Sequence, residues 1–156
     1  MKAIFMNSRP GRKADLLPFQ PSAKSIKVSV HQLVNDLLAS LQPHANKRNN
    51  VLVNGVPREL CFIAEENLLA YVLWNLISGV NSNKKNESIH VQTLVDDHRT
   101  MICVKDAGTY LYRSLASDYR RLQDAAEKIG GCIDMYIDET HGCNIVFSIS
   151  NTRMAV

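Results

Sequence analysis

Several features are absent from this sequence of 156 residues, and each absence excludes a class of protein. No apolar run approaches the roughly 18 residues of a membrane span, and the first residues contain no apolar core of a secretory signal. The four cysteines form no Cys-x-x-Cys pair, and each lies in an apolar stretch: Cys61, Cys103, Cys132 and Cys143. Their spacing does not resemble a zinc site, and isolated cysteines usually pack as small apolar side chains. We therefore expect a soluble, cytoplasmic protein without membrane insertion, disulfide framework or metal site.

The sequence also lacks a strong excess of charge of one sign, because the net charge is only +3. This charge is uneven: residues 1–27 contain six basic residues and one acidic residue, which leaves 12 basic and 14 acidic residues afterwards. A slightly acidic body argues against a nucleic-acid-binding domain. The basic N-terminal segment is either a solvated tail or a contact for an acidic partner, and the sequence leaves both interpretations open.

Proline is scarce and gathered at one end. Three of the five prolines, Pro10, Pro18 and Pro21, fall in residues 1–25, which show no sustained hydrophobic period. We expect an N-terminal arm over residues 1–25 with one short ordered piece around residues 16–19. Residues 26–150 are long enough to bury the core of one domain, and residues 151–156 form a C-terminal tail.

The clearest periodic pattern occupies residues 65–85. Its apolar residues recur at i, i+3, i+4, i+7 and i+11, which predicts one buried stripe along a helix: Leu69, Val72, Leu73, Leu76 and Val80. Tyr71, Asn75 and Gly79 are spaced four apart and line a different face. Helix propensity does not explain an asparagine in the middle of a helix. Either Asn75 makes a local hydrogen bond to its own helix or it has a function.

The remaining elements follow from hydrophobic period and turn residues. A helix begins at Val30 and keeps its period until Pro43, which we expect to bend or end it. Another helix covers residues 114–129, and one residue of the pair Gly130-Gly131 takes the left-handed conformation that ends it. Strands are expected at residues 26–30, 51–53, 61–63, 88–96, 101–106, 132–137 and 144–150. This order predicts an α+β fold, a two-layer α/β sandwich with three helices on one face of a mixed, mostly antiparallel sheet.

Four stretches, taken in order, resemble the ATP-binding catalytic domain of sensor histidine kinases, in the GHKL superfamily. VSVHQLVNDLLASLQPHANKRNN is similar to the first strand and helix of that domain, and WNLISGVNSN to its N box. ICVKDAGTY resembles the strand entering the G1 box, and AAEKIGGCIDMYIDETHGCNIVFSIS the last helix and terminal hairpin. The resemblance covers residues 26–150 and implies the Bergerat fold of that superfamily, here in a degenerate form.

The resemblance also implies a nucleotide site that is incomplete. Asn75 matches the first asparagine of the N box, but Gly79 stands where a second asparagine usually binds magnesium. Asp106 and Gly108 match the G1 box, whose carboxylate accepts a hydrogen bond from the adenine amino group, whereas Tyr110 replaces its second glycine. Asn75, Asp106 and Gly108 are thus expected to form a vestigial nucleotide pocket without a metal site.

The lid of the kinases and their glycine-rich G2 box are missing. Eight residues separate Tyr110 from Tyr119, and the G2 position reads SDYR, with no glycine and with Asp118, whose charge repels phosphate. Nearby arginines offer some compensation: Arg113, Arg120 and Arg121.

The short loop is instead rich in large side chains: Tyr110, Leu111, Tyr112 and Leu115, with Arg113 among them. Either these side chains fill the empty pocket or they form a surface that binds a partner. The sequence leaves both alternatives open.

None of the five histidines lies in the His-Glu/Asp-x-x-Thr-Pro context of a phosphoacceptor helix, which excludes autophosphorylation in cis. Three hypotheses remain. The first is a domain that has lost productive ATP binding and acts as a protein-interaction or regulatory module in bacterial signalling, without a cofactor. The second is a domain that binds ATP or ADP weakly with magnesium but does not hydrolyse it. The third is a kinase or ATPase completed by another chain. We expect a protein partner of unknown identity, and the sequence leaves open whether the chain forms a homo-oligomer.

Overall fold

The structure is a computed structural model, and it describes residues 4–5, 24–106, 119–138 and 142–153. The helices are α1 (Val30–Lys47), α2 (Glu66–Asn83), α4 (Tyr119–Lys128) and the short 3-10 helix η2 (Asn151–Arg153). The strands are β1 (Ile4–Phe5), β2 (Ile26–Ser29), β3 (Val51–Asn54), β4 (Cys61–Ala64), β5 (Ser88–Val95), β6 (Arg99–Asp106), β7 (Gly131–Asp138) and β8 (Gly142–Ser150).

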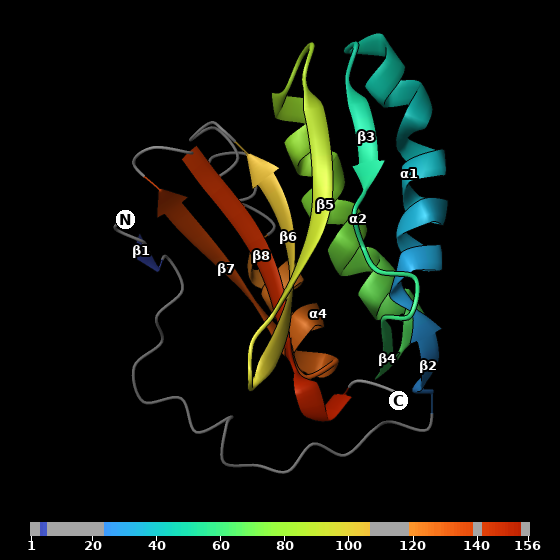
Figure 1. The fold of residues 1–156 in the computed structure, drawn as a ribbon, viewed down its shortest axis with the longest axis vertical. Coiled ribbons are helices and arrows are strands. Elements are labelled where there is room, and N and C mark those ends of the chain that lie inside the picture. The colour runs from blue at the N-terminus through green and yellow to red at the C-terminus, as the bar shows by residue number, and fades with distance from the viewer. Residues whose placement is uncertain (1–3, 6–23, 107–118, 139–141, 154–156) are drawn as a thin grey trace.

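Six strands form one mixed sheet in the order β1-β7-β8-β6-β5-β3, and β2 and β4 form a separate antiparallel pair. Only β3 and β5 run parallel within the large sheet, whereas its other pairs are antiparallel. Helices α1, α2 and α4 lie side by side on one face of this sheet, with α2 in the middle (Figure 1). The predicted α+β sandwich with three helices on one sheet face is confirmed.

The apolar stripe of α2 forms the centre of the core. Its five predicted members, Leu69, Val72, Leu73, Leu76 and Val80, are all fully buried, whereas Tyr71 on the other face is 41% exposed. The stripe packs toward the sheet because the alternating inward side chains of β5, β6 and β8 are also apolar and buried. The periodicity therefore predicted the correct inward face of this helix.

Helix α1 does not end at Pro43, contrary to one of the two alternatives that the sequence suggested. It continues to Lys47, and Pro43 lies inside it. Proline removes only one N–H from the helix, and the following turn is held because Ala45 is buried and its carbonyl accepts from the amides of Arg48 and Asn50. The burial of Ala45 and the two hydrogen bonds to its carbonyl thus outweigh the local effect of the proline.

The glycine pair after α4 has two separate functions. Gly130 has φ 79°, so it is the left-handed residue that ends the helix, as predicted. Gly131 begins β7 in close contact with β8, where an added Cβ would lie 2.4 Å from Cε2 of Phe147. The first glycine permits the turn, and the second permits the close approach of the two strands.

The edge of the sheet at β7 is closed by two other elements. Strand β1 pairs with residues Tyr136 and Ile137 of β7, so two residues of the predicted arm belong to the sheet. Further along, the side chain of Gln123 in α4 accepts from the Ile133 amide at 2.9 Å, and the Tyr119 hydroxyl donates to the Ile133 carbonyl at 2.9 Å. The expected ordered piece at residues 16–19 and the expected helix start at residues 114–118 lie outside the described residues.

Candidate functional site

The N-box positions lie on the face of α2 that turns away from the buried stripe, where Asn75 and Gly79 are partly exposed. The Asn75 side-chain nitrogen donates to the Tyr71 carbonyl at 2.7 Å, so this amide is bound to its own helix. One turn later the Gly79 carbonyl accepts from the Asn83 side chain at 2.8 Å. Asn75 therefore makes the local hydrogen bond that was one of its two predicted explanations.

Asp106, which the resemblance matches to the G1 box, ends a strand that packs against α2. Asp106 is the last residue of β6, where its backbone pairs with Cys143 of β8, and β6 packs against α2. The structure thus brings together the helix that carries Asn75 and the strand that ends in Asp106. The other predicted site residues lie outside the described residues: Gly108, Tyr110, Leu111, Tyr112, Arg113 and Leu115.

The donor set on α2 does not fit a magnesium ion that bridges phosphates. Magnesium requires oxygen ligands in near-octahedral geometry, and Gly79 offers no side-chain oxygen. Within the described ranges, no group of three or more histidine, cysteine, aspartate or glutamate side chains is placed to hold a metal ion.

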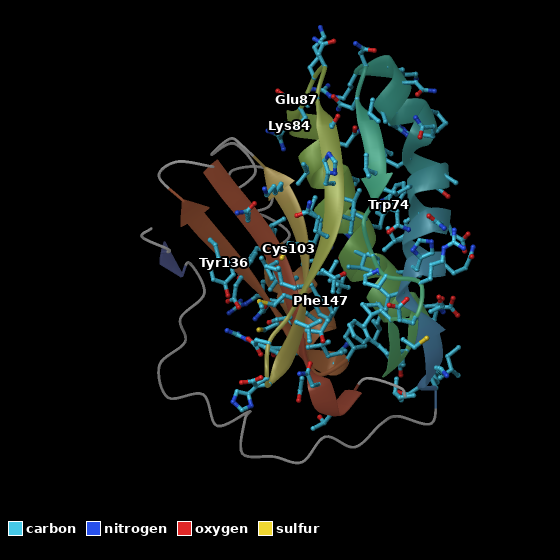
Figure 2. The ribbon with its side chains drawn as sticks, in the orientation of Figure 1. Trp74, Lys84, Glu87, Cys103, Tyr136 and Phe147 are labelled. Atoms are coloured by element: carbon cyan, nitrogen blue, oxygen red, sulfur yellow. The ribbon has the colours of Figure 1, made fainter. Side chains whose placement is uncertain are left out.

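A buried pair of asparagines, which sequence reasoning missed, fixes the end of α2. Asn50 and Asn81 are 4% and 1% exposed, and the Asn50 side-chain nitrogen donates to Asn81 Oδ1 at 2.9 Å. The same nitrogen lies 3.1 Å from the Lys84 carbonyl, and Asn50 Oδ1 accepts from the Glu87 amide at 3.1 Å. Figure 2 labels Lys84 and Glu87 at the end of the molecule where α2 leads into β5. This asparagine clamp, formed by Asn50 and Asn81, joins the C-terminal end of α2 to the connection between α1 and β3.

No signal in the sequence pointed to the asparagine clamp. Asn50 stands in a polar stretch that reads as a loop, and Asn81 stands near the polar end of a helix. Both settings are typical of exposed residues. The hydrogen bonds that satisfy the two buried side chains join residues far apart in the chain.

A second polar cluster lies on the sheet face opposite the helices. The Cys132 thiol lies 3.0 Å from Ser148 Oγ and 3.5 Å from Asp134 Oδ2. Burial raises the pKa of the Cys132 thiol, and the charge of Asp134 acts in the same direction. Burial also raises the pKa of the Asp134 carboxyl. The thiol therefore remains protonated near neutral pH and is a poor nucleophile.

Two further cysteines, Cys61 and Cys103, have the structural character that the sequence suggested. Cys61 and Cys103 are free thiols, and Cys103 is buried on the sheet, where Figure 2 labels it near Tyr136. Burial raises the pKa of the Cys103 thiol as well. These cysteines pack as small apolar side chains, and no nucleophilic site is built from them.

No family model matches this chain, and the search of curated proteins found no match either. Solved structures do match. The catalytic domain of the histidine kinase ThkA superposes with a TM-score of 0.67 at 15% identity over 81% of this chain and 96% of that chain. The mycobacterial sensor histidine kinase MprB gives a TM-score of 0.67 at 13% identity over 81% of this chain and 97% of that chain. ThkA in complex with the response regulator protein TrrA gives a TM-score of 0.63 at 16% identity over 81% of this chain and 41% of that chain.

At such low identity these matches show the fold, which is that of histidine kinase catalytic domains. The distant resemblance stated from the sequence motifs is thereby confirmed. In addition, none of the helices in the described part of the chain is long and apolar enough to cross a bilayer.

Proposed function

We propose that this chain is a histidine-kinase-like GHKL domain that has lost productive ATP binding and acts as a protein-interaction or regulatory module in bacterial signalling, in the cytoplasm. The observation that carries this proposal is the N-box face of α2. Gly79 supplies no side chain at the usual position of a metal ligand, and the nitrogen of Asn75 is bound to Tyr71 within the helix. One amide oxygen cannot replace two side-chain ligands for magnesium.

The sequence of the neighbouring loop supports the same proposal. Tyr110 places a ring where the family has a glycine, and Asp118 adds negative charge where the family binds phosphate. The tyrosine and the aspartate each disfavour binding of a nucleoside triphosphate, independently of the metal.

A protein partner is supported by the nature of the fold's relatives. The histidine kinase ThkA, whose fold this chain shares, has been captured with a response regulator protein. We propose a protein partner for the present chain on this basis.

One observation favours a second candidate function, namely nucleotide binding without hydrolysis. Asp106 remains at the end of β6, and β6 packs against α2. In the family the matching carboxylate recognises adenine, which does not require magnesium. Weak binding of ATP or ADP is therefore the alternative that must be tested, together with completion of the site by another chain.

We expect no thermal shift when ATP or ADP with magnesium is added to the protein at millimolar concentration. A ligand at 100 times its Kd would add about 2.7 kcal/mol to stability, which corresponds to roughly 5 to 10 °C for a chain of this size.

The variant Gly79→Asn restores the metal-facing amide, but we expect it to remain without ATP turnover because Tyr110 and Asp118 are unchanged.

A magnesium-dependent shift of the unmodified protein would contradict loss of ATP binding. A shift with ADP that is independent of magnesium would support the alternative of nucleotide binding through Asp106. Turnover by Gly79→Asn alone would show that a single ligand separates this chain from an active ATPase.

We further propose that the partner binds the loop cluster Tyr110, Leu111, Tyr112 and Leu115 with Arg113. Aromatic side chains and arginine are the residues that most often dominate binding energy at interfaces. For the double variant Tyr110→Ser with Tyr112→Ser, we expect near-normal stability and loss of the proteins that the unmodified chain retains in a pull-down.

Chemical denaturation separates this result from the alternative. A loss of more than about 3 kcal/mol would mean that the tyrosines fill the empty pocket, as expected for large buried side chains that are truncated. Unchanged stability with unchanged binding would contradict both interpretations of the loop.

A further inference from the structure

Strand β5 extends beyond the strand that covers its edge. It runs from Ser88 to Val95, but β3 pairs with it only as far as Val91. The last bond between them joins the Gly55 amide to the Val91 carbonyl at 2.7 Å. The chain then turns toward β4, while β5 continues into its hairpin with β6 (Figure 1). Residues 92–95 therefore have a neighbouring strand on one side only.

The backbone groups at this open edge belong to Thr93 and Val95. The N–H and C=O of a strand residue point to the same edge, and successive residues alternate between the two edges. Because the Val91 carbonyl points toward β3, the groups of Thr93 and Val95 point to the same side. In the described part of the chain, the hydrogen bonds from β3 and the segment after it stop at Val91.

At the other end of the sheet, the edge of β7 is covered by two other elements. There, β1 pairs with β7, and Gln123 and Tyr119 of α4 bind the Ile133 amide and carbonyl. The Thr93 side chain is partly buried, but no backbone hydrogen bond from another described segment reaches Thr93 or Val95 on this side of β5. The edge of β7 is thus covered, whereas the open part of β5 lacks the cover that normally prevents association between sheets.

The side chains at the open edge favour pairing. Leu94 and Val95 are 58% and 62% exposed, which makes them two of the most exposed large apolar side chains described. The stretch Gln92–Val95 has no charge and no proline, and its register with β6 is continuous, without a bulge. Proteins that remain monomeric usually protect an exposed strand edge with a charged residue, a proline or a bulge.

We propose that the open edge of β5, residues 92–95, pairs antiparallel with the same edge of a second copy of this chain. A two-fold axis at Leu94 places Thr93 of each copy opposite Val95 of the other, so that the free N–H and C=O groups of both residues bond across the interface. Leu94 of one copy then lies beside Leu94 of the other, on the sheet face that also carries Met101, the partner of Leu94 in β6. This inference does not depend on the proposed loss of ATP binding.

The charges around the edge fit this self-association. In the two-fold arrangement Asp96 comes opposite the neutral Gln92, so no two like charges face each other. A contact between such short strands buries less than the roughly 1,000 Å² of a stable interface. The dimer is therefore weak and reversible, and it forms at high protein concentration.

Sedimentation equilibrium of the full chain over a range of concentrations tests the proposal. We expect the average mass to rise from monomer toward dimer, and Leu94→Lys to weaken association at least tenfold, on the order expected for like charges at the two-fold axis. Val51→Lys is the matched control, because Val51 is also 58% exposed but lies where β3 begins, away from the open edge. It should leave association unchanged.

Thr93→Pro provides a second variant, because it removes the outward N–H without adding charge. It should also weaken association, and chemical denaturation checks that it remains folded. A monomer at every concentration would overturn the proposal, and so would equal weakening by Leu94→Lys and Val51→Lys, because another surface would then be responsible.

Discussion

Replacing Leu73 with alanine should lower the free energy of unfolding by about 2 to 5 kcal/mol, measured by urea denaturation. Leu73 lies at the middle of the α2 stripe and is fully buried. It belongs to the buried apolar cluster that also includes residues of β5, β6 and β8 and of the other helices. Its truncation loses the transfer free energy of the removed carbons and leaves a cavity that a packed core closes only in part.

Tyr71→Ala is the control for this prediction, because Tyr71 lies on the same helix two residues away and is 41% exposed. Its replacement by the best helix former should change stability by less than about 1 kcal/mol. A loss below about 1 kcal/mol for Leu73→Ala as well would show that α2 turns a different face toward the sheet.

Replacing Asn50 with alanine should cost about 3 kcal/mol, although the residue is polar and stands outside every helix and strand. The change removes the partner of two buried or partly buried groups, Asn81 Oδ1 and the Glu87 amide. The Lys84 carbonyl loses one of two donors, because Arg48 Nε still donates to it at 2.7 Å. An unsatisfied buried polar group costs about 1 to 3 kcal/mol, and water reaching the site recovers part of this cost.

Gln42→Ala serves as the control for the asparagine clamp. Gln42 is also an amide, but it is exposed and its side chain bonds only Asn46 within α1, so its loss should cost less than about 0.5 kcal/mol. Hydrogen exchange offers a second measurement, because Asn50→Ala should speed exchange in the last turn of α2 more than at the centre of the sheet. Equal protection of both regions in the variant would contradict a local role for the clamp.

Within the described residues, the elements that the sequence predicted well are those with a strong local period. The apolar stripe of α2 repeats over several helical turns, and the apolar–polar alternation of β5, β6, β7 and β8 repeats over several residues. A single residue that departs from the pattern therefore does not hide it. Pro43 shows the limit of local rules, because it lies inside a helix that buried Ala45 holds in place. The resemblance to the N box singled out Asn75 and Gly79, and the structure added the hydrogen bond from the Asn75 side-chain nitrogen to the Tyr71 carbonyl.

The sequence by itself determined which faces are apolar, where the glycine turn after α4 falls, and that the N-box position of a metal ligand has no side chain. These properties depend on residue type and on neighbours within about one helical turn. Only the tertiary structure decided that β3 runs parallel beside β5, that β2 and β4 form a separate sheet, and that Asn50 binds Asn81. It also decided that β3 stops pairing with β5 at Val91 and that Leu94 and Val95 beyond this point are exposed. Strand partners and buried hydrogen bonds join segments distant in the chain, and the packing of the whole core selects them, so no local pattern encodes them.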